Sequence, residues 1–165
     1  MSVSAPILLE ITTQSVEDTE AIGAALGARL GQGGVICLEG DLGAGKTAFV
    51  RGVGRGWGAL ERVTSPTFTL VHEHRRTQDD QVLFHVDCYR LERLSDAWSL
   101  GLDEMLHGTD NVVLEWPERV IDLLPEERLW IAFDIVSESS RVLRVSASGA
   151  QYAALVEALR DGAAD

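Results

Sequence analysis

One eight-residue segment constrains the fold of this chain more than any other. Residues 40–47 read Gly-Asp-Leu-Gly-Ala-Gly-Lys-Thr and fit the pattern G-x-x-x-x-G-K-S/T. The apolar run Val-Ile-Cys-Leu precedes them at 35–38, and apolar side chains recur at helical spacing over residues 46–57. A buried strand, a glycine-rich loop and a helix together form a phosphate-binding unit, because backbone N–H groups converge on the β-phosphate. We therefore predict nucleotide binding, with Lys46 on the β- and γ-phosphates and the Thr47 hydroxyl on Mg²⁺.

The alternative for this segment is a glycine-rich turn that fits the pattern by chance. The strand before it and the helix after it argue against that alternative, because a phosphate-binding loop needs both. The loop residues expected to contact the nucleotide are Asp41, Leu42, Gly43, Ala44, Gly45, Lys46 and Thr47.

Composition limits both the size of the protein and its partners. With 165 residues, 45% of them hydrophobic, we expect a single domain over residues 1–165. The chain has 14 basic and 26 acidic residues and a formal charge of −12, so direct and extensive contact with nucleic acid is a poor expectation. No segment approaches the ~20 apolar residues that span a bilayer, so we expect a cytoplasmic protein without a membrane partner.

The remaining pattern alternates strands with helices. The expected strands are 7–12, 35–38, 67–74, 82–87, 111–116, 129–136 and 141–148, and the expected helices are 15–30, 46–57, 91–106 and 150–160. We expect a hairpin loop at 75–81 and disorder at 162–165. This order predicts the α/β class: a three-layer sandwich like that of P-loop NTPases, with a mostly parallel central sheet and antiparallel additions.

Two expected strands end in a carboxylate, Asp87 and Glu115. Phosphoryl transfer needs a metal, a carboxylate that holds it and a group that orients the attacking oxygen. Both carboxylates would reach the ligand side of the sheet if their strands run parallel to the loop strand. Either can hold Mg²⁺. The alternative for each is a carboxylate that ends a strand, faces solvent and binds no ligand. We assign Thr47 and Glu115 to the metal and Asp87 to a water molecule, so that Lys46, Asp87 and Glu115 are the candidate catalytic residues.

Other segments are ambiguous. Residues 65–68 read Ser-Pro-Thr-Phe and lie where P-loop proteins often sense the γ-phosphate; Thr67 then offers a hydroxyl, but an ordinary Ser-Pro turn fits equally well. Trp116 lies near the nucleotide or is a core aromatic residue. Residues 13–19 lie at a plausible distance from the loop to bind the base of the nucleotide. The histidines His72, His74, His85 and His107 have no convincing metal-ligand spacing and are read as core or surface residues.

Four segments, 38–47, 63–71, 85–91 and 115–119, resemble in order and spacing the TsaE family, the bacterial ATPases of tRNA threonylcarbamoyladenosine synthesis. The resemblance implies a small cytoplasmic ATPase that uses ATP and Mg²⁺. It also implies partnership with the TsaD and TsaB proteins, which modify the tRNA, so that tRNA is reached only indirectly. By this resemblance, Thr47 and Glu115 would bind the metal ion. Asp87 corresponds to the family's functionally important aspartate, Thr67 to its switch threonine and Trp116 to its strand-end tryptophan.

Two other functions are compatible with a phosphate-binding loop. A small-molecule P-loop kinase needs a lid with several arginines, and no arginine-rich segment of that kind stands out. A nucleotide-dependent interaction module that does not hydrolyse ATP would use Asp87 and Glu115 only as structural residues.

Overall fold

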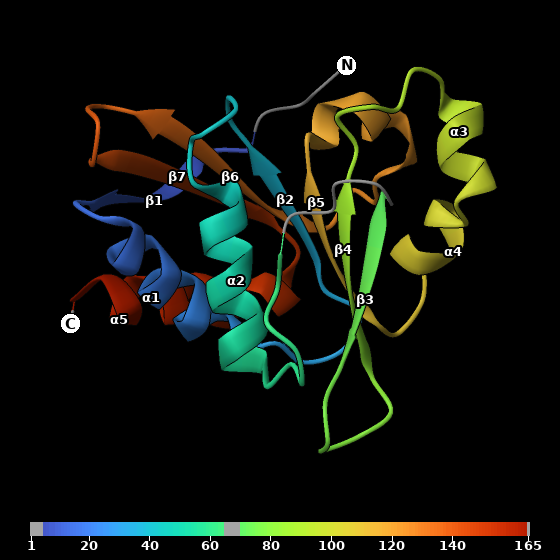
Figure 1. The fold of residues 1–165 in the computed structure, drawn as a ribbon, viewed down its shortest axis with the longest axis horizontal. Coiled ribbons are helices and arrows are strands. Elements are labelled where there is room, and N and C mark those ends of the chain that lie inside the picture. The colour runs from blue at the N-terminus through green and yellow to red at the C-terminus, as the bar shows by residue number, and fades with distance from the viewer. Residues whose placement is uncertain (1–4, 65–69, 165) are drawn as a thin grey trace.

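A computed structural model describes residues 5–64 and 70–164 of the chain. Seven strands form one sheet with helices on both faces (Figure 1). The strands are β1 (Ile7–Thr13), β2 (Val35–Glu39), β3 (Val71–Arg75), β4 (Val82–Asp87), β5 (Asn111–Glu115), β6 (Arg128–Ile135) and β7 (Arg141–Ser148). The α-helices are α1 (Val16–Gly27), α2 (Lys46–Trp57), α3 (Leu94–Ser99), α4 (Leu102–Leu106) and α5 (Ala153–Ala164), and two 3₁₀ helices are η1 (Pro117–Leu123) and η2 (Ala150–Tyr152).

The strand order is β1-β7-β6-β2-β5-β4-β3. The four central strands β6, β2, β5 and β4 run parallel to one another. At one edge β3 is antiparallel to β4, and at the other β7 is antiparallel to both β6 and β1. The predicted class, a three-layer α/β sandwich with antiparallel additions, is confirmed.

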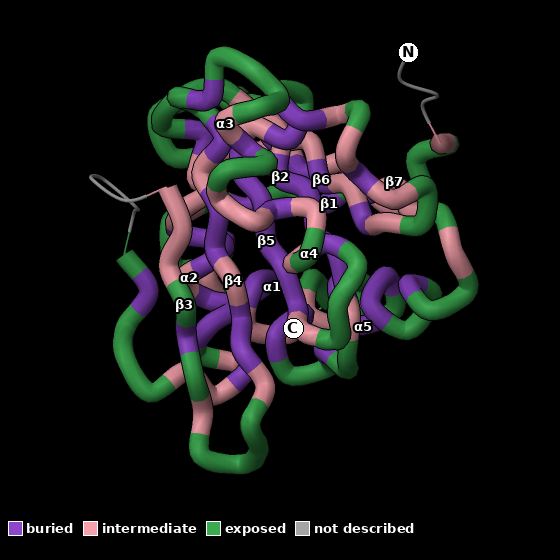
Figure 2. The backbone as a smooth tube through the Cα atoms, turned by 90° about the vertical axis from the view of Figure 1, so that its right-hand side faces the viewer, coloured by how far each residue is buried: buried purple, intermediate pink, exposed green. Residues whose placement is uncertain are grey.

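Strand β2 lies in the middle of the molecule and is buried on both faces (Figure 2). Its side chains alternate between the two faces. Ile36 and Leu38 belong to the core under α1, α2 and α5, whereas Val35 and Cys37 belong to the core under α3, α4 and η1. The apolar run that precedes the loop is thus a fully covered parallel strand.

Helices α1 and α2 pack with their backbones in close approach. A Cβ atom on Gly23 of α1 would lie 2.2 Å from the Phe49 carbonyl oxygen, and one on Gly52 of α2 would lie 2.0 Å from the Glu20 carbonyl oxygen. A Cβ atom on Gly56 would likewise lie 2.0 Å from the Ala24 carbonyl oxygen. These distances leave no room for a side chain, so glycine is required at this contact.

Several predicted boundaries agree closely with the structure. Helix α2 spans residues 46–57, and Ser15 caps α1, its hydroxyl accepting the Asp18 N–H at 3.0 Å. The predicted helix 91–106 is wrong in two respects: residues 91–93 are not helical, and the rest forms two short helices, α3 and α4. Gly101 separates them with a φ of 76°, a left-handed conformation that ends α3.

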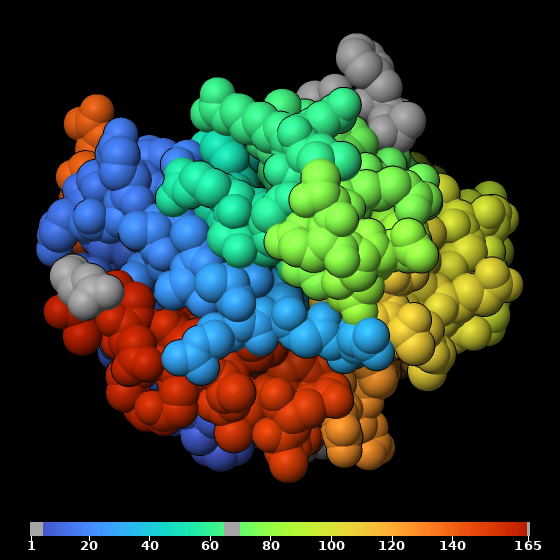
Figure 3. Space-filling model, turned by 90° about the horizontal axis from the view of Figure 1, so that it is seen from below, coloured from blue at the N-terminus to red at the C-terminus, as the bar shows by residue number. Residues whose placement is uncertain are grey.

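The C-terminal segment also differs from expectation. Helix α5 continues to Ala164, so the expected disorder is wrong for residues 162–164. Gly162 lies against α1, since a Cβ there would be 2.7 Å from the Ala25 side chain. Figure 3 shows the C-terminal part of the chain in contact with the N-terminal part. Within the described part of the chain, no helix is both long and apolar enough to cross a bilayer.

Candidate nucleotide site

The glycine-rich loop joins the carboxyl end of β2 to the first turn of α2. Gly43 and Gly45 have φ angles of 82° and 101°, in the left-handed region that favours glycine. Gly45 is the N-cap of α2, so the free N–H groups of the first helical turn open into the loop. Free N–H groups and the positive end of the helix dipole make this position suited to a phosphate.

Arg141, the first residue of β7, supports the loop from the side. Its Nε donates to the Ala44 carbonyl and its Nη2 to the Gly43 carbonyl, both at 3.2 Å. Its Nη1 donates to the Ser137 carbonyl at 2.7 Å. Sequence reasoning missed this residue, because nothing in the local sequence places an arginine of the last strand beside a loop almost 100 residues earlier.

Lys46 is buried, with 4% of its surface exposed. Its Nζ donates to the Gly40 carbonyl and lies 3.9 Å from the centre of the Trp116 ring. Burial lowers the pKa of Lys46 from its ordinary value, while the carboxylates of Glu115 and Glu118 act in the opposite direction. The ammonium group is therefore held inside the site, next to the candidate carboxylates.

Glu115 ends β5 beside the loop and is 5% exposed. Its Oε2 accepts a hydrogen bond from Thr47 Oγ1 at 3.3 Å and one from His85 Nε2 at 2.6 Å. The parallel pairing of β2, β5 and β4 places Asp87 directly opposite Glu115 in the sheet. The structure thus brings Lys46, Thr47, Asp87 and Glu115 to one end of the sheet, and a hydroxyl and carboxylates are the oxygen ligands that Mg²⁺ prefers.

Asp87 of this group and the neighbouring Trp116 each make a further contact with Tyr89. Asp87 Oδ1 accepts the Tyr89 N–H at 3.0 Å. Trp116 has a φ of 59°, the only positive value at a non-glycine residue in the described part of the chain, and its ring packs on that of Tyr89 in a tilted arrangement, with 4.7 Å between the ring centres. Because Lys46 Nζ also lies over the Trp116 ring, Trp116 is placed beside the loop. Thr67 and residues 65–68 fall outside the described residues.

A pocket of about 440 Å³ adjoins the loop. Its lining includes Ser15 and Thr19 of the segment considered for the base, Gly43 and Gly45 of the loop, and Arg141. The Thr19 hydroxyl is hydrogen-bonded to the Thr13 hydroxyl at 2.9 Å, which fixes the wall of the pocket.

A loop at the carboxyl end of a central parallel strand, with carboxylates at neighbouring strand ends, defines the class of P-loop NTPase-like α/β proteins. The sequence profile of the family "Threonylcarbamoyl adenosine biosynthesis protein TsaE" matches residues 13–143. The chain belongs to the TsaE family.

Individual relatives agree. The chain is similar to the "tRNA threonylcarbamoyladenosine biosynthesis protein TsaE" of Treponema pallidum, with 39% identity over 84% of this chain and 100% of that protein. The protein of the same name in Bacillus subtilis is 40% identical over 92% of this chain and 93% of its own length. The crystal structure of Bacillus subtilis YdiB covers 97% of this chain and 98% of its own, with 34% identity and a TM-score of 0.76.

Proposed function

We propose that this protein is a Mg²⁺-dependent ATPase that acts in the formation of threonylcarbamoyladenosine in tRNA. The observation that carries the ATPase proposal is the contact between Thr47 Oγ1 of the loop and Glu115 Oε2 of β5. Two oxygen ligands from the phosphate-binding helix and a strand end are the arrangement that holds Mg²⁺ on a nucleotide. The role in tRNA modification rests on membership of the TsaE family.

The residues of the chain have separate roles in this proposal. The N–H groups of residues 41–47 bind the phosphates, and Lys46 exchanges the Gly40 carbonyl for phosphate oxygens. Thr47 and Glu115 would hold Mg²⁺, which neutralises charge on the β- and γ-phosphates when bound. Asp87 orients the attacking water. The pocket beside Thr19 and Arg141 receives the base, and Trp116 and Thr67 complete the set of nucleotide contacts.

We further propose that the activity depends on TsaD and TsaB proteins, with tRNA reached through them. The family name supports a place in this pathway. The net charge of −12 supports an indirect encounter with tRNA, because the chain repels a polyanion.

Phosphate release from ATP tests the proposal, measured with Mg²⁺ or with a chelator and with or without TsaD and TsaB. We expect slow release alone, faster release with both partners, and none without Mg²⁺. Lys46→Ala should lower kcat/KM by at least about a hundredfold, because it removes charge stabilisation of the transferred phosphoryl group. Arg29→Ala is the matched control, since this exposed cation follows α1, outside the residues of the site.

Three results would contradict the proposal. Equal rates with and without the partners would argue against partner dependence. Nucleotide binding without any phosphate release, even in the full complex, would favour a non-hydrolysing module. Label transferred from ATP to a metabolite, with no free phosphate, would favour a small-molecule kinase.

A further inference from the structure

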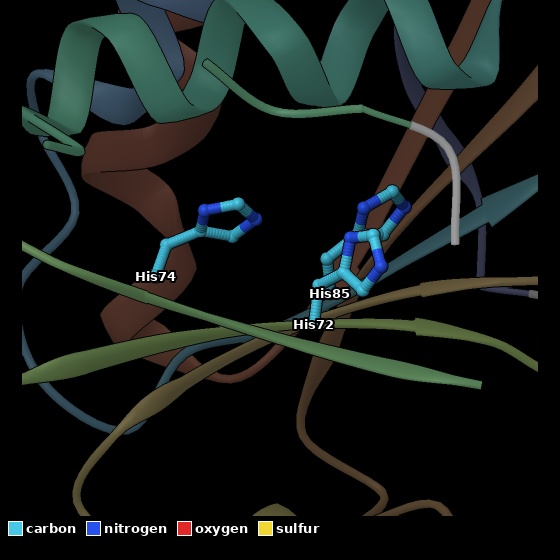
Figure 4. A group of neighbouring side chains, drawn as sticks. All are labelled: His72, His74 and His85. Carbon is cyan, nitrogen blue, oxygen red and sulfur yellow. The ribbon is translucent and has the colours of Figure 1, made fainter. Parts of the chain in front are cut away.

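Three histidines meet on one face of the β3–β4 hairpin (Figure 4). His72 and His74 are two residues apart on β3, and His85 of β4 is the cross-strand partner of His72. Alternate residues of a strand point to the same face, as do directly paired residues, so the hairpin register brings the three rings together. One ligand nitrogen from each ring lies within 4.8 Å of the other two. The interpretation as core residues holds for His74 and His85, which are buried, but local spacing did not show that the three rings come together.

His85 has a buried nitrogen with an unused lone pair. The residue is fully buried, and its Nε2 is hydrogen-bonded to Glu115 Oε2 at 2.6 Å. Because a carboxylate accepts, Nε2 carries a hydrogen, and in the neutral ring Nδ1 is then the acceptor. Among the described residues, Nδ1 finds no hydrogen-bond partner. A buried polar atom without a partner costs free energy, and a metal ion would use this lone pair.

His74 repeats the pattern from the other strand. It is 8% exposed, and its Nε2 is buried without a hydrogen-bond partner in the described part of the chain. Its Nε2 is thus a second buried nitrogen available to a metal ion on the same face of the hairpin, and histidine binds metals in its neutral form.

We propose that His72, His74 and His85 together bind one divalent transition-metal ion of the Zn²⁺ class, with the Glu115 carboxylate orienting His85 from outside. A carboxylate on the second nitrogen of a ligand histidine is the usual way to fix its tautomer and ring orientation. Three imidazoles suit Zn²⁺ and its neighbours in the first transition series, whereas Mg²⁺ prefers oxygen. Three protein ligands leave one tetrahedral position open.

The geometry needs a small closure of the rings. Nitrogens 2.0–2.1 Å from a tetrahedral Zn²⁺ lie about 3.4 Å apart, so nitrogens at the present limit of 4.8 Å must approach by about 1.4 Å. His72 can supply this movement, because it lies on the edge strand β3 and is only partly buried. His85, fixed by Glu115, would be the stationary ligand. The site is distinct from the proposed Mg²⁺ site, since it shares no ligand atom with it.

Co²⁺ binding to the untagged full chain tests the proposal. The protein is freed of metal with a chelator and titrated with Co²⁺ in the absence of nucleotide. We expect one Co²⁺ per chain with the strong visible absorption of four- or five-coordinate cobalt, displaced by Zn²⁺ and not by millimolar Mg²⁺. Because no ATP is present, this result is independent of whether the chain hydrolyses ATP.

Variants identify the ligands. His74→Ala and His72→Ala should each weaken Co²⁺ and Zn²⁺ binding by more than about tenfold, because loss of an outer partner alone costs about 10–100-fold. His107→Ala is the control, since this exposed histidine at the end of α4 is bonded only to Asp103 within the described residues. Circular dichroism checks that each variant is folded. Absence of one-to-one binding in the wild-type protein overturns the proposal, as does binding that survives both substitutions unchanged.

Discussion

Glu115 Oε2 is the atom that joins the loop to the histidine cluster. It accepts from Thr47 Oγ1 on one side and from His85 Nε2 on the other. Charge is what an amide would remove here, because its single oxygen could still accept from both neighbours but would carry no negative charge. Asp87, its neighbour across the parallel ladder, instead accepts the Tyr89 N–H, and we assign it a different role.

Substitution separates these two roles. Glu115→Gln should lower Mg²⁺-dependent ATP hydrolysis about 100-fold or more and raise the Mg²⁺ concentration needed, because a metal ligand loses its charge. Asp87→Asn should lower the rate while leaving the Mg²⁺ dependence as it was. Phosphate release over a Mg²⁺ titration measures both effects, with the exposed Glu126→Gln as control. Unchanged hydrolysis in both variants would refute the catalytic assignment.

Arg141 is predicted to favour nucleotide binding by holding the glycine-rich loop in its conformation. Arg141→Ala removes hydrogen bonds to the Gly43 and Ala44 carbonyls, so nucleotide affinity should fall about tenfold, equivalent to about 1.4 kcal/mol. Arg144→Ala is a matched control on the same strand, because Arg144 instead pairs with Glu10 and Asp134. Titration with a fluorescent ATP analogue compares the two variants. Equal affinities would show that the loop keeps its form without Arg141.

At the scale of elements, the contact between α1 and α2 fixes the position of the phosphate-binding helix. Gly52→Ala would place a methyl group 2.0 Å from the Glu20 carbonyl oxygen, a backbone atom that cannot turn aside. Alanine favours a helix over glycine by about 1 kcal/mol, but overpacking costs about 1–3 kcal/mol and here requires the helices to separate. We expect net destabilisation, seen in urea unfolding. Gly31→Ala, where no atom lies within 4 Å of the new Cβ, should leave stability nearly unchanged.

The same two helices are also joined by an ion pair that depends on pH. Arg51 Nη1 contacts Glu20 Oε1 at 2.7 Å, and Arg55 Nη1 contacts Oε2 at 3.3 Å. The hydrogen bond from Arg51 lowers the pKa of Glu20 below its ordinary value of 4.5, although burial opposes this effect. The carboxylate therefore stabilises the fold above pH 4.5, and this contribution is lost as the pH falls through the lower, folded-state pKa.

Glu20→Gln tests that dependence. The variant should be less stable than the wild type at pH 7 by about 0.5–1 kcal/mol, the usual size for a partly exposed pair. The difference should shrink below pH 4.5 and vanish once Glu20 is protonated. Urea unfolding at a series of pH values measures it. A gap of constant size across the whole series would contradict the assignment.

Sequence patterns predicted the elements well where the local signal was strong. The run before the loop and the helix after it are continuous patterns within one segment, and the structure has both. The helix expected at 91–106 failed because apolar spacing continues across Gly101, whose backbone conformation depends on one residue. The histidine cluster depends on cross-strand register, and Arg141 reaches the loop only through the sheet order. Neither relation leaves a pattern in a local stretch of sequence.

For the molecule as a whole, charge decides which partners it meets first. With a formal charge of −12, the isolated chain should bind unmodified tRNA more weakly than about 10⁻⁴ M at about 150 mM salt, because the phosphate backbone drives non-specific affinity. Fluorescence anisotropy with labelled tRNA measures this. Micromolar binding by the chain alone would contradict the proposed indirect encounter.

The sheet order also determines when the molecule can assemble during its synthesis. Strand β2, which carries the loop, has β5 on one side and β6 on the other, and both come much later in the chain. In a chain still growing on the ribosome, one edge of β2 has no hydrogen-bonded neighbour until Glu115 has been made, and the other has none until Ile135 has been made. Eight residues in the first third of the sequence specify the loop, yet the strands that support it are translated long after it.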